Sequence, residues 1–426
     1  MSSRTPSDQA AVARHGWARA VATVLAGLAA MAVVAALGLW AAGATGLPGN
    51  AFWRVVAATL VTAVGGSVEM SGDAGALVGS DSGLTVIPLT VTLTGVLVIA
   101  AGFLRPLRHR AVAGARELAG WAGRIAALWL LALLGLALAA RQTFEVSLGE
   151  GDLGDIGELF GVSPEVGFRA DVPLTLLFGL LWLAGVLVLA VLVAPGAPLP
   201  GRLLRFAAAV RPAAYAMVVL LLAYVALGVL VGLIVAATRG HAAETFAVLL
   251  LGLPNLVWLV LTLGLGASWE GRVKGPFGLP MPQVLDEVLR VPGVATLDVG
   301  TLAEHDGQAW WLVAVAAVLV TAAGFLMATR SPARTRVWQH AVHMAVALAL
   351  TVLTICLVAR ISAHYGLSVL GIGDLGGDLA GDLFLRPRLW RAVALALLWG
   401  LAAGALGGLL ARPVRRRGEA APEPEG

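Results

Sequence analysis

Runs of apolar residues long enough to cross a bilayer recur along the whole chain, separated by short polar segments. A helix needs about 20 apolar residues to cover the hydrocarbon core of a membrane. Eight runs meet that requirement and predict transmembrane helices. They are Ala20–Ala42, Leu84–Leu104, Trp121–Ala140, Val172–Ala194, Ala213–Ala237, Ala309–Thr329, Val337–Ala359 and Leu389–Ala411.

Two further apolar segments are irregular. Val55–Val68 has only 14 residues and ends in Gly65-Gly66. Thr245–Trp269 is long enough to span but is interrupted by Gly252 and by Pro254-Asn255. The pattern predicts an all-α polytopic bundle with about eight full spans plus two re-entrant or half-length helices. If both irregular segments cross, the chain has ten spans.

Composition excludes a soluble protein. Of the 426 residues, 59% are hydrophobic and 13% are charged, whereas a soluble domain has about 25% charged residues. The single cysteine excludes a disulfide framework and any cysteine-based metal site. The net charge of +4 comes from arginines in short loops rather than from one patch, which is not typical of nucleic-acid binding.

Arginine clusters predict the orientation, because basic loops face the cytoplasm. All five clusters lie on one side only if the irregular segments do not cross, which puts both chain ends in the cytoplasm and the protein in the plasma membrane. Acidic loops at 145–171 and 361–385 alternate with them. The exceptions are Arg386, Arg388 and Arg391, which lie on the predicted outside, near outer headgroups or an acidic loop. The clusters are Arg4, Arg14 and Arg19; Arg105, Arg108, Arg110 and Arg116; Arg202, Arg205 and Arg211; Arg330, Arg334 and Arg336; and Arg412, Arg415, Arg416 and Arg417.

Tryptophans lie near the ends of the predicted spans, as the aromatic belts of membrane proteins require. They are Trp17, Trp40, Trp53, Trp121, Trp310, Trp311, Trp338 and Trp390.

Short motifs recur in the same order along the chain. VLVIAAGFL at Val96–Leu104 returns as VLVTAAGFL 222 residues later, and LGEGDLG at Leu148–Gly154 returns as LGIGDLG at the same offset. The pattern G-x-S-x-E occurs twice with an offset of 201, and a longer loop at 271–308 explains the difference. We interpret these as two tandem repeats of the same orientation, as in parallel-repeat transporters. The expected parts are a cytoplasmic tail at 1–16, a first repeat at 17–194, a basic cytoplasmic linker at 195–212, a second repeat at 213–411 and a disordered cytoplasmic tail at 412–426.

Interrupted segments at matching places in two repeats are a sequence indicator of a binding site. In this chain the two segments are 51–70 and 245–270. Each supplies a glycine that could permit a bend, a serine hydroxyl and a glutamate carboxylate. The alternative is that they are ordinary helix ends whose serine and glutamate cap and solvate. The candidate binding residues are Gly65, Ser67, Glu69, Gly266, Ser268 and Glu270.

Other candidates are also paired between the repeats. Asp152 and Asp374 occupy the two GDLG loops, where a solvated turn is the alternative interpretation. Arg124 and His343 recur one turn inside the third full span of each repeat, at a depth where an arginine can extend to the interface. His340 lies on the same face as His343, but two histidines without a third ligand give no metal site, and none is expected.

Enzyme motifs such as GxxxxGK[ST], HExxH and GxSxG are absent from the sequence. We therefore expect no catalytic residue and no cofactor. The first hypothesis is a non-enzymatic protein that organises envelope or membrane components, with the lipid bilayer and other membrane proteins as partners and no nucleic acid. The alternative is a transporter or channel for a small molecule or ion, with its site between the two irregular segments.

The chain resembles the streptophobe family of very hydrophobic actinobacterial membrane proteins. The resemblance is carried by VGGSVEMSGDAGAL at Val64–Leu77, IPLTVTLTG at Ile87–Gly95, LPN at Leu253–Asn255 and the GDLG loop. It implies a multi-pass plasma-membrane protein and nothing catalytic. The zinc-ribbon-like segment of some members does not transfer, since the cysteines for it are absent. The PLT-containing span and Gly-rich link are also similar to those of PerM-type cell-division membrane proteins, as an analogy of layout.

Overall fold

The computed structural model describes ten stretches of the chain, and the structural statements below refer to these residues. They are 6–47, 51–73, 78–106, 115–145, 165–194, 204–274, 287–290, 293–332, 334–369 and 381–413.

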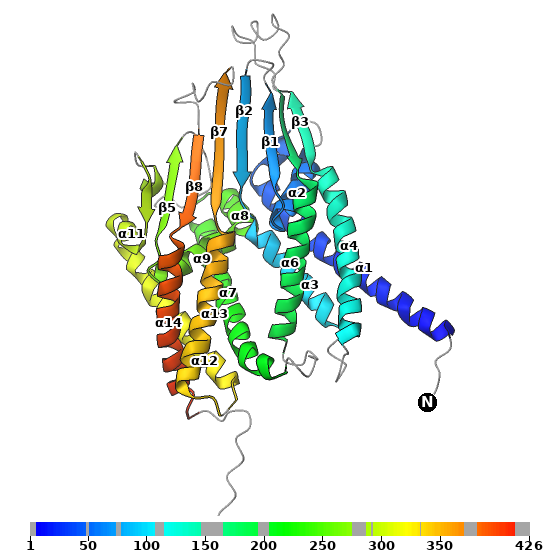
Figure 1. Ribbon diagram of the computed structural model, residues 1–426. Helices are drawn as coiled ribbons and strands as arrows, with labels where there is room; N and C mark the ends of the chain where they lie inside the picture. Colours follow the sequence, from blue (N-terminus) through cyan, green and yellow to red (C-terminus); the bar gives the residue numbers. More distant parts are fainter. Residues whose placement is uncertain are drawn as a thin grey trace, which may run out of the picture.

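A bundle of long apolar helices forms the body of the molecule (Figure 1). Among the described residues, seven helices are long and apolar enough to cross a membrane. The expectation of a multi-pass helical membrane protein is therefore confirmed. The full span expected at Leu84–Leu104 is not among the seven, because α3 (Leu89–Leu104) has only 16 residues and is shorter than a usual span. The seven are α1 (Pro6–Ala41), α4 (Ala115–Ala139), α6 (Val172–Val193), α7 (Leu204–Thr238), α12 (Trp311–Arg330), α13 (Val337–Val358) and α14 (Leu389–Leu410).

The two irregular segments fold as short helices. The first is α2 (Ala51–Ala63), which follows a short 3-10 helix, η1 (Ala44–Gly46). The second consists of α8 (Ala242–Leu251) and α9 (Leu253–Gly264), which meet at Gly252 with a bend of 77°. The break expected at Gly252 and Pro254 is confirmed, because proline supplies no N–H to continue the preceding helix.

An eight-stranded antiparallel sheet lies at one end of the bundle, and the pattern of the sequence did not predict it (Figure 1). Every strand comes from a connection between helices at that end. Figure 1 places the start of α1 and the end of α14 away from the sheet. The strands are β1 (Val68–Asp73), β2 (Val78–Thr85), β3 (Arg141–Glu145), β4 (Glu165–Ala170), β5 (Trp269–Lys274), β6 (Ala295–Leu297), β7 (Ile361–Val369) and β8 (Gly381–Pro387).

The strand order contains the same arrangement twice. The order is β3-β4-β1-β2-β7-β8-β5-β6, so four strands from the first half of the chain are followed by four from the second. The two groups join where β2 pairs with β7 in eight residue pairs, from Val78↔Val369 to Thr85↔Ser362. One sheet therefore connects both halves of the chain outside the helices.

Glycines determine how closely the last three helices pack. On α14, a Cβ at Gly404 would lie 2.5 Å from the carbonyl oxygen of His340 on α13. A Cβ at Gly407 would collide with the backbone of Gly324 on α12. Only glycine permits such close approach of helix backbones. In the first half, by contrast, large side chains fill the core, where Trp129 and Trp182 stack with ring centroids 5.3 Å apart.

The tryptophans named for the aromatic belt are exposed with one exception. Seven of these eight tryptophans are exposed on the described surface, six at or near helix ends and Trp17 at the start of the apolar span Gly16–Ala41 within α1. Trp121 is buried, with 8% exposure, and its Nε1 donates a hydrogen bond to the carbonyl oxygen of Phe103. Its place in the belt was therefore a wrong prediction, because α3 packs over the ring and provides an acceptor for the indole N–H.

The linker and the longer loop of the second half contain helical structure that the sequence did not predict. Helix α7 begins at Leu204, inside the segment expected to be a linker, and continues through Pro212. The longer loop of the second half contains α11 (Val299–His305) and a 3-10 helix, η3 (Gly307–Trp310). Asp298 caps α11 by accepting a hydrogen bond from the Thr301 N–H at 3.0 Å.

Candidate functional site

The two G-x-S-x-E motifs form the same turn. Gly65 and Gly266 both have φ of 87°, the left-handed region that ends helices α2 and α9. The next N–H in each turn reaches back to the helix, from Gly66 to the Val61 carbonyl at 2.9 Å and from Ala267 to the Thr262 carbonyl at 3.0 Å. The sequence correctly placed a bend at each glycine, and each bend turns a helix into a strand.

The serines of the two turns have equivalent backbone partners. The Ser67 carbonyl accepts a hydrogen bond from the Asp171 N–H at 3.1 Å, and the Ser268 carbonyl accepts one from the Arg388 N–H at 3.0 Å. Both side-chain Oγ atoms are buried and have no hydrogen-bond partner among the described residues. The serines thus join each turn to the strand–helix junction beside it.

The glutamates lie outside the apolar part of the bundle, in the sheet. Glu69 is exposed on β1, directly opposite Arg169 of β4. Glu270 occupies the same position on β5, opposite Arg386 of β8, and its Oε1 lies 2.7 Å from Nε of Arg388. Their places favour a role in the sheet surface over a role inside the bundle.

The structure does not bring the two motifs to one place. Strands β2, β7 and β8 lie between β1 and β5 in the sheet. Neighbouring strands are about 4.8 Å apart, so Glu69 and Glu270 are separated by roughly 19 Å across the sheet. The geometry therefore gives two equivalent turns rather than one shared pocket.

The remaining predicted candidates are dispersed. Arg124 on α4 lies over the ring of Trp17 on α1, with Cζ 5.9 Å from the centroid. His343 is half-buried on α13. Asp152 and Asp374 lie outside the described residues. Within the described part of the chain, no group of three or more His, Cys, Asp or Glu side chains could hold a metal ion.

A polar joint between the halves, which the candidate residues did not include, lies at the break between α8 and α9. The Asn255 side chain donates from Nδ2 to the Ile87 carbonyl at 2.9 Å and accepts from the Leu89 N–H at 3.2 Å. Asn255 is only 9% exposed. Helix α3 begins after its N-cap residue, Pro88, whose side chain makes no capping hydrogen bond to the helix. Asn255 therefore caps a helix of the other half.

Thr90 of α3 bonds the two backbone groups that are left without a helical partner where α8 and α9 meet. Its hydroxyl donates to the Leu249 carbonyl at 3.1 Å and accepts from the Leu253 N–H at 3.2 Å. In a continuous helix, that N–H would donate directly to that carbonyl, four residues earlier. The Thr90 hydroxyl is thus inserted into the broken helix and satisfies both freed groups, which would otherwise be costly in an apolar interior.

Packing around this joint also depends on the first half. A Cβ at Gly38 of α1 would lie 2.6 Å from Cγ of Leu251, so α1 approaches the end of α8 closely. The sequence signals for the joint were the interruption at Pro254-Asn255 and the segments LPN and IPLT, which the family resemblance had singled out. Comparison with protein-family models, curated proteins and solved structures finds no match for this chain.

Proposed function

We propose that this multi-pass membrane protein is a non-enzymatic organiser of envelope components, which presents a sheet at the membrane surface as a binding platform. The observation that carries the proposal is the continuous sheet, joined across the halves by the eight pairs of β2 and β7. Residues of the two irregular segments, together with Thr90 of α3, support that platform. Asn255 and Thr90 hold the halves together, and the two glycine turns lead into β1 and β5.

The proposal includes a tandem duplication in which both repeats have the same orientation in the membrane. In each half, the same glycine turn comes directly after a short helix, α2 in the first half and α9 in the second. The four strands of each half are also arranged in the same order in the sheet. The registers agree as well, because Glu69 lies opposite Arg169 just as Glu270 lies opposite Arg386. Two unrelated halves would have no physical reason to share turn, order and register.

The orientation is likewise proposed from charge. The connections at the end opposite the sheet include the segments with Arg105 and Arg330, and the chain continues from α14 into Arg412 at that end (Figure 1). With eight spans, including α3, these arginines face the cytoplasm and the sheet faces outward. The protein then lies in the plasma membrane with both termini inside, and the resemblance to the streptophobe family agrees with that layout.

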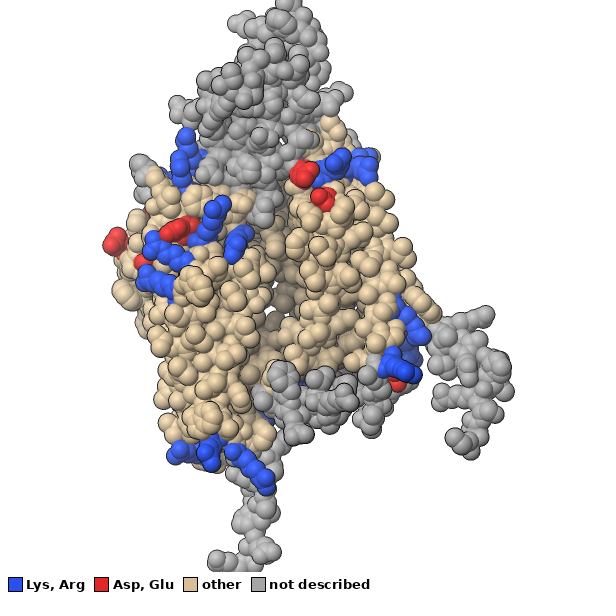
Figure 2. Space-filling model, in the orientation of Figure 1, with Lys and Arg blue, Asp and Glu red and all other residues tan. Residues whose placement is uncertain are grey.

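A transporter is the second candidate, and one observation favours it. Figure 2 shows the face between the two halves hollowed below the sheet, between the helices around α14 and those around α4. A lateral hollow between two repeats is where parallel-repeat transporters alternate their access. The separation of the two motifs across the sheet favours the platform instead.

Photo-crosslinking in intact cells tests the platform. A photoreactive residue at Glu69 or Arg141 of the sheet should give discrete adducts with envelope components, and one at Arg412, at the opposite end, should not. Cysteine-accessibility scanning of 51–69 and 245–274 provides the second arm. If sheet positions give no adduct while cysteines within α2 or α9 react with polar reagents from both sides of the membrane, the platform is rejected in favour of the transporter.

A further inference from the structure

Cations gather on one face of the second half of the sheet. Along β8, Leu383 and Leu385 are buried, so Phe384 and Arg386 point to the opposite face. Along β5, Trp269 and Val273 are likewise buried, which places Glu270, Arg272 and Lys274 on that opposite face, next to Phe384 and Arg386 in the register. Figure 2 shows Lys and Arg side chains gathered on this part of the surface.

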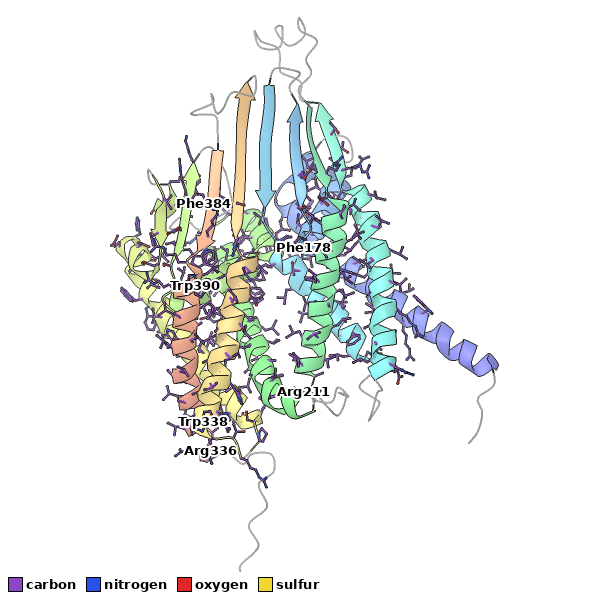
Figure 3. All side chains as sticks on the ribbon, in the orientation of Figure 1. Phe178, Arg211, Arg336, Trp338, Phe384 and Trp390 are labelled. Carbon is purple, nitrogen blue, oxygen red and sulfur yellow. The ribbon has the colours of Figure 1, made fainter. Side chains whose placement is uncertain are left out.

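The cations continue into the first turn of α14, where the chain enters the apolar bundle. Arg388 and Arg391 are both exposed there. Trp390 between them is 89% exposed, the highest value among the large hydrophobic side chains described. Figure 3 shows Phe384 and Trp390 at the junction between β8 and α14. An exposed tryptophan at the end of an apolar helix is typical of the headgroup level of a bilayer. We call Arg272, Lys274, Arg386, Arg388, Trp390 and Arg391 the basic face.

The corresponding positions of the first half lack most of these cations. The registers of β1 with β4 and of β5 with β8 define the correspondence, which rests on the strand pairing alone. Arg169 and Arg386 are alike, but four other positions change from neutral or acidic to basic. These are Ser71 to Arg272, Asp73 to Lys274, Asp171 to Arg388 and Leu174 to Arg391.

Glu270, an acid beside the basic face, forms an ion pair with Arg388. Glu270 holds Arg388 at 2.7 Å, while the side chains of both residues remain nearly half exposed. Arg386 lies over the Phe384 ring, with Cζ 5.4 Å from the centroid. Asp382 of β8 is a second acid in this part of the sheet, directly opposite Lys274 in the register. The local charge stays positive, because two acidic residues are set against five cations, Arg272, Lys274, Arg386, Arg388 and Arg391. The second half thus has a cationic surface beside an aromatic anchor, at the level where α14 leaves the bundle.

We propose that the basic face binds the headgroup of an anionic phospholipid in the leaflet at the sheet end of the bundle. Arg388 and Arg391 bind the phosphate, Trp390 lies among the glycerol and upper acyl groups, and Arg272 and Lys274 extend the positive potential above them. Bidentate geometry suits arginine to phosphate oxygens. Each cation at a membrane surface strengthens binding to anionic lipid by about five-fold. The inference goes beyond the proposed function and does not depend on it.

Native mass spectrometry of the purified full chain in neutral detergent tests this site. Phosphatidylglycerol is titrated against phosphatidylcholine, and the wild type should bind phosphatidylglycerol more tightly. The double variant Arg388→Gln/Arg391→Gln should lose about 30-fold of that affinity, with phosphatidylcholine binding unchanged. The matched control Arg334→Gln/Arg412→Gln removes two exposed arginines from the opposite end and should retain the preference.

Glu270→Gln separates lipid binding from a purely structural role of the Arg388 pair. It breaks the same ion pair but leaves every cation in place, so phosphatidylglycerol should bind as tightly as before or more tightly. Inorganic phosphate at millimolar concentration should not displace the lipid. Equal binding of the two lipids by the wild type, an unaffected Arg388→Gln/Arg391→Gln variant, or displacement by free phosphate would overturn the proposal.

Discussion

Replacing Asn255 by alanine removes the cap that one half supplies to a helix of the other. The change deletes two hydrogen bonds, those with the Ile87 carbonyl and the Leu89 N–H. Both groups belong to the start of α3, where proline at position 88 leaves no neighbouring side-chain cap. Since Asn255 is 9% exposed, water has little access to replace it. We therefore expect Asn255→Ala to destabilise the fold.

The magnitude follows from what the two groups lose. Each buried polar group left without a partner costs about 1–3 kcal/mol, whereas interhelical hydrogen bonds in membrane proteins contribute only about 0.6 kcal/mol on average. The alanine variant leaves two such groups inside the protein, so we expect a loss of about 2–4 kcal/mol. Thr90→Val should have a similar cost, about 2–4 kcal/mol, because the Leu249 carbonyl and the Leu253 N–H both lose their partner at the bend.

Unfolding by SDS titration of the purified protein measures these differences. Thr354→Val is the matched control, since that hydroxyl is exposed and bonds only the Leu350 carbonyl of its own helix. The control should lie within about 0.5 kcal/mol of wild type. If Asn255→Ala is as stable as this control, the joint does not hold the halves together and the reasoning is refuted.

Further predictions concern helix packing and the sheet surface. Gly407→Ala should lower stability by about 1–3 kcal/mol because its Cβ would collide with the backbone of Gly324, whereas Gly135→Ala, with no neighbour within 4 Å, should raise it by about 0.5–1 kcal/mol. The same SDS titration checks both, and equal effects would contradict the packing argument. Glu270→Gln breaks an ion pair with Arg388 whose partners are 42% and 48% exposed. It should cost less than about 1 kcal/mol, and a larger loss would mean that the pair is structural.

The sequence predicted the membrane helices because their signal is local. Length and apolarity alone identify a span such as Val172–Val193, and the actual helix differs from the expected one by a single residue. The interruption at Gly252 was equally readable, because a glycine two residues before Pro254 weakens the helix and the proline cannot donate the next backbone hydrogen bond. The sequence predicted that this helix begins at Leu84, whereas α3 begins at Leu89. The difference arises because β2 extends to Thr85 and Pro88 precedes the helix.

The sheet and the joint could not be read in the same way. β2 and β7 pair residues nearly 300 positions apart, and their sequences, rich in glycine and serine, carry little of the β-branched alternation that marks a strand. The contact of Asn255 with Leu89 likewise depends on how two halves meet in space. Trp121 shows the converse error, since its position near a predicted span end did not reveal that α3 would bury it.

The position of the two halves relative to the membrane decides between this architecture and a ten-span chain. Compartment-specific reporter tags inserted after Leu104, at the end of α3, and after Thr329, near the end of α12, measure it directly in cells. If α2 and the bent pair α8–α9 do not cross, both tags report the cytoplasm. Tags reporting opposite compartments would contradict two halves of one orientation, and with them a sheet assembled on a single side of the bilayer.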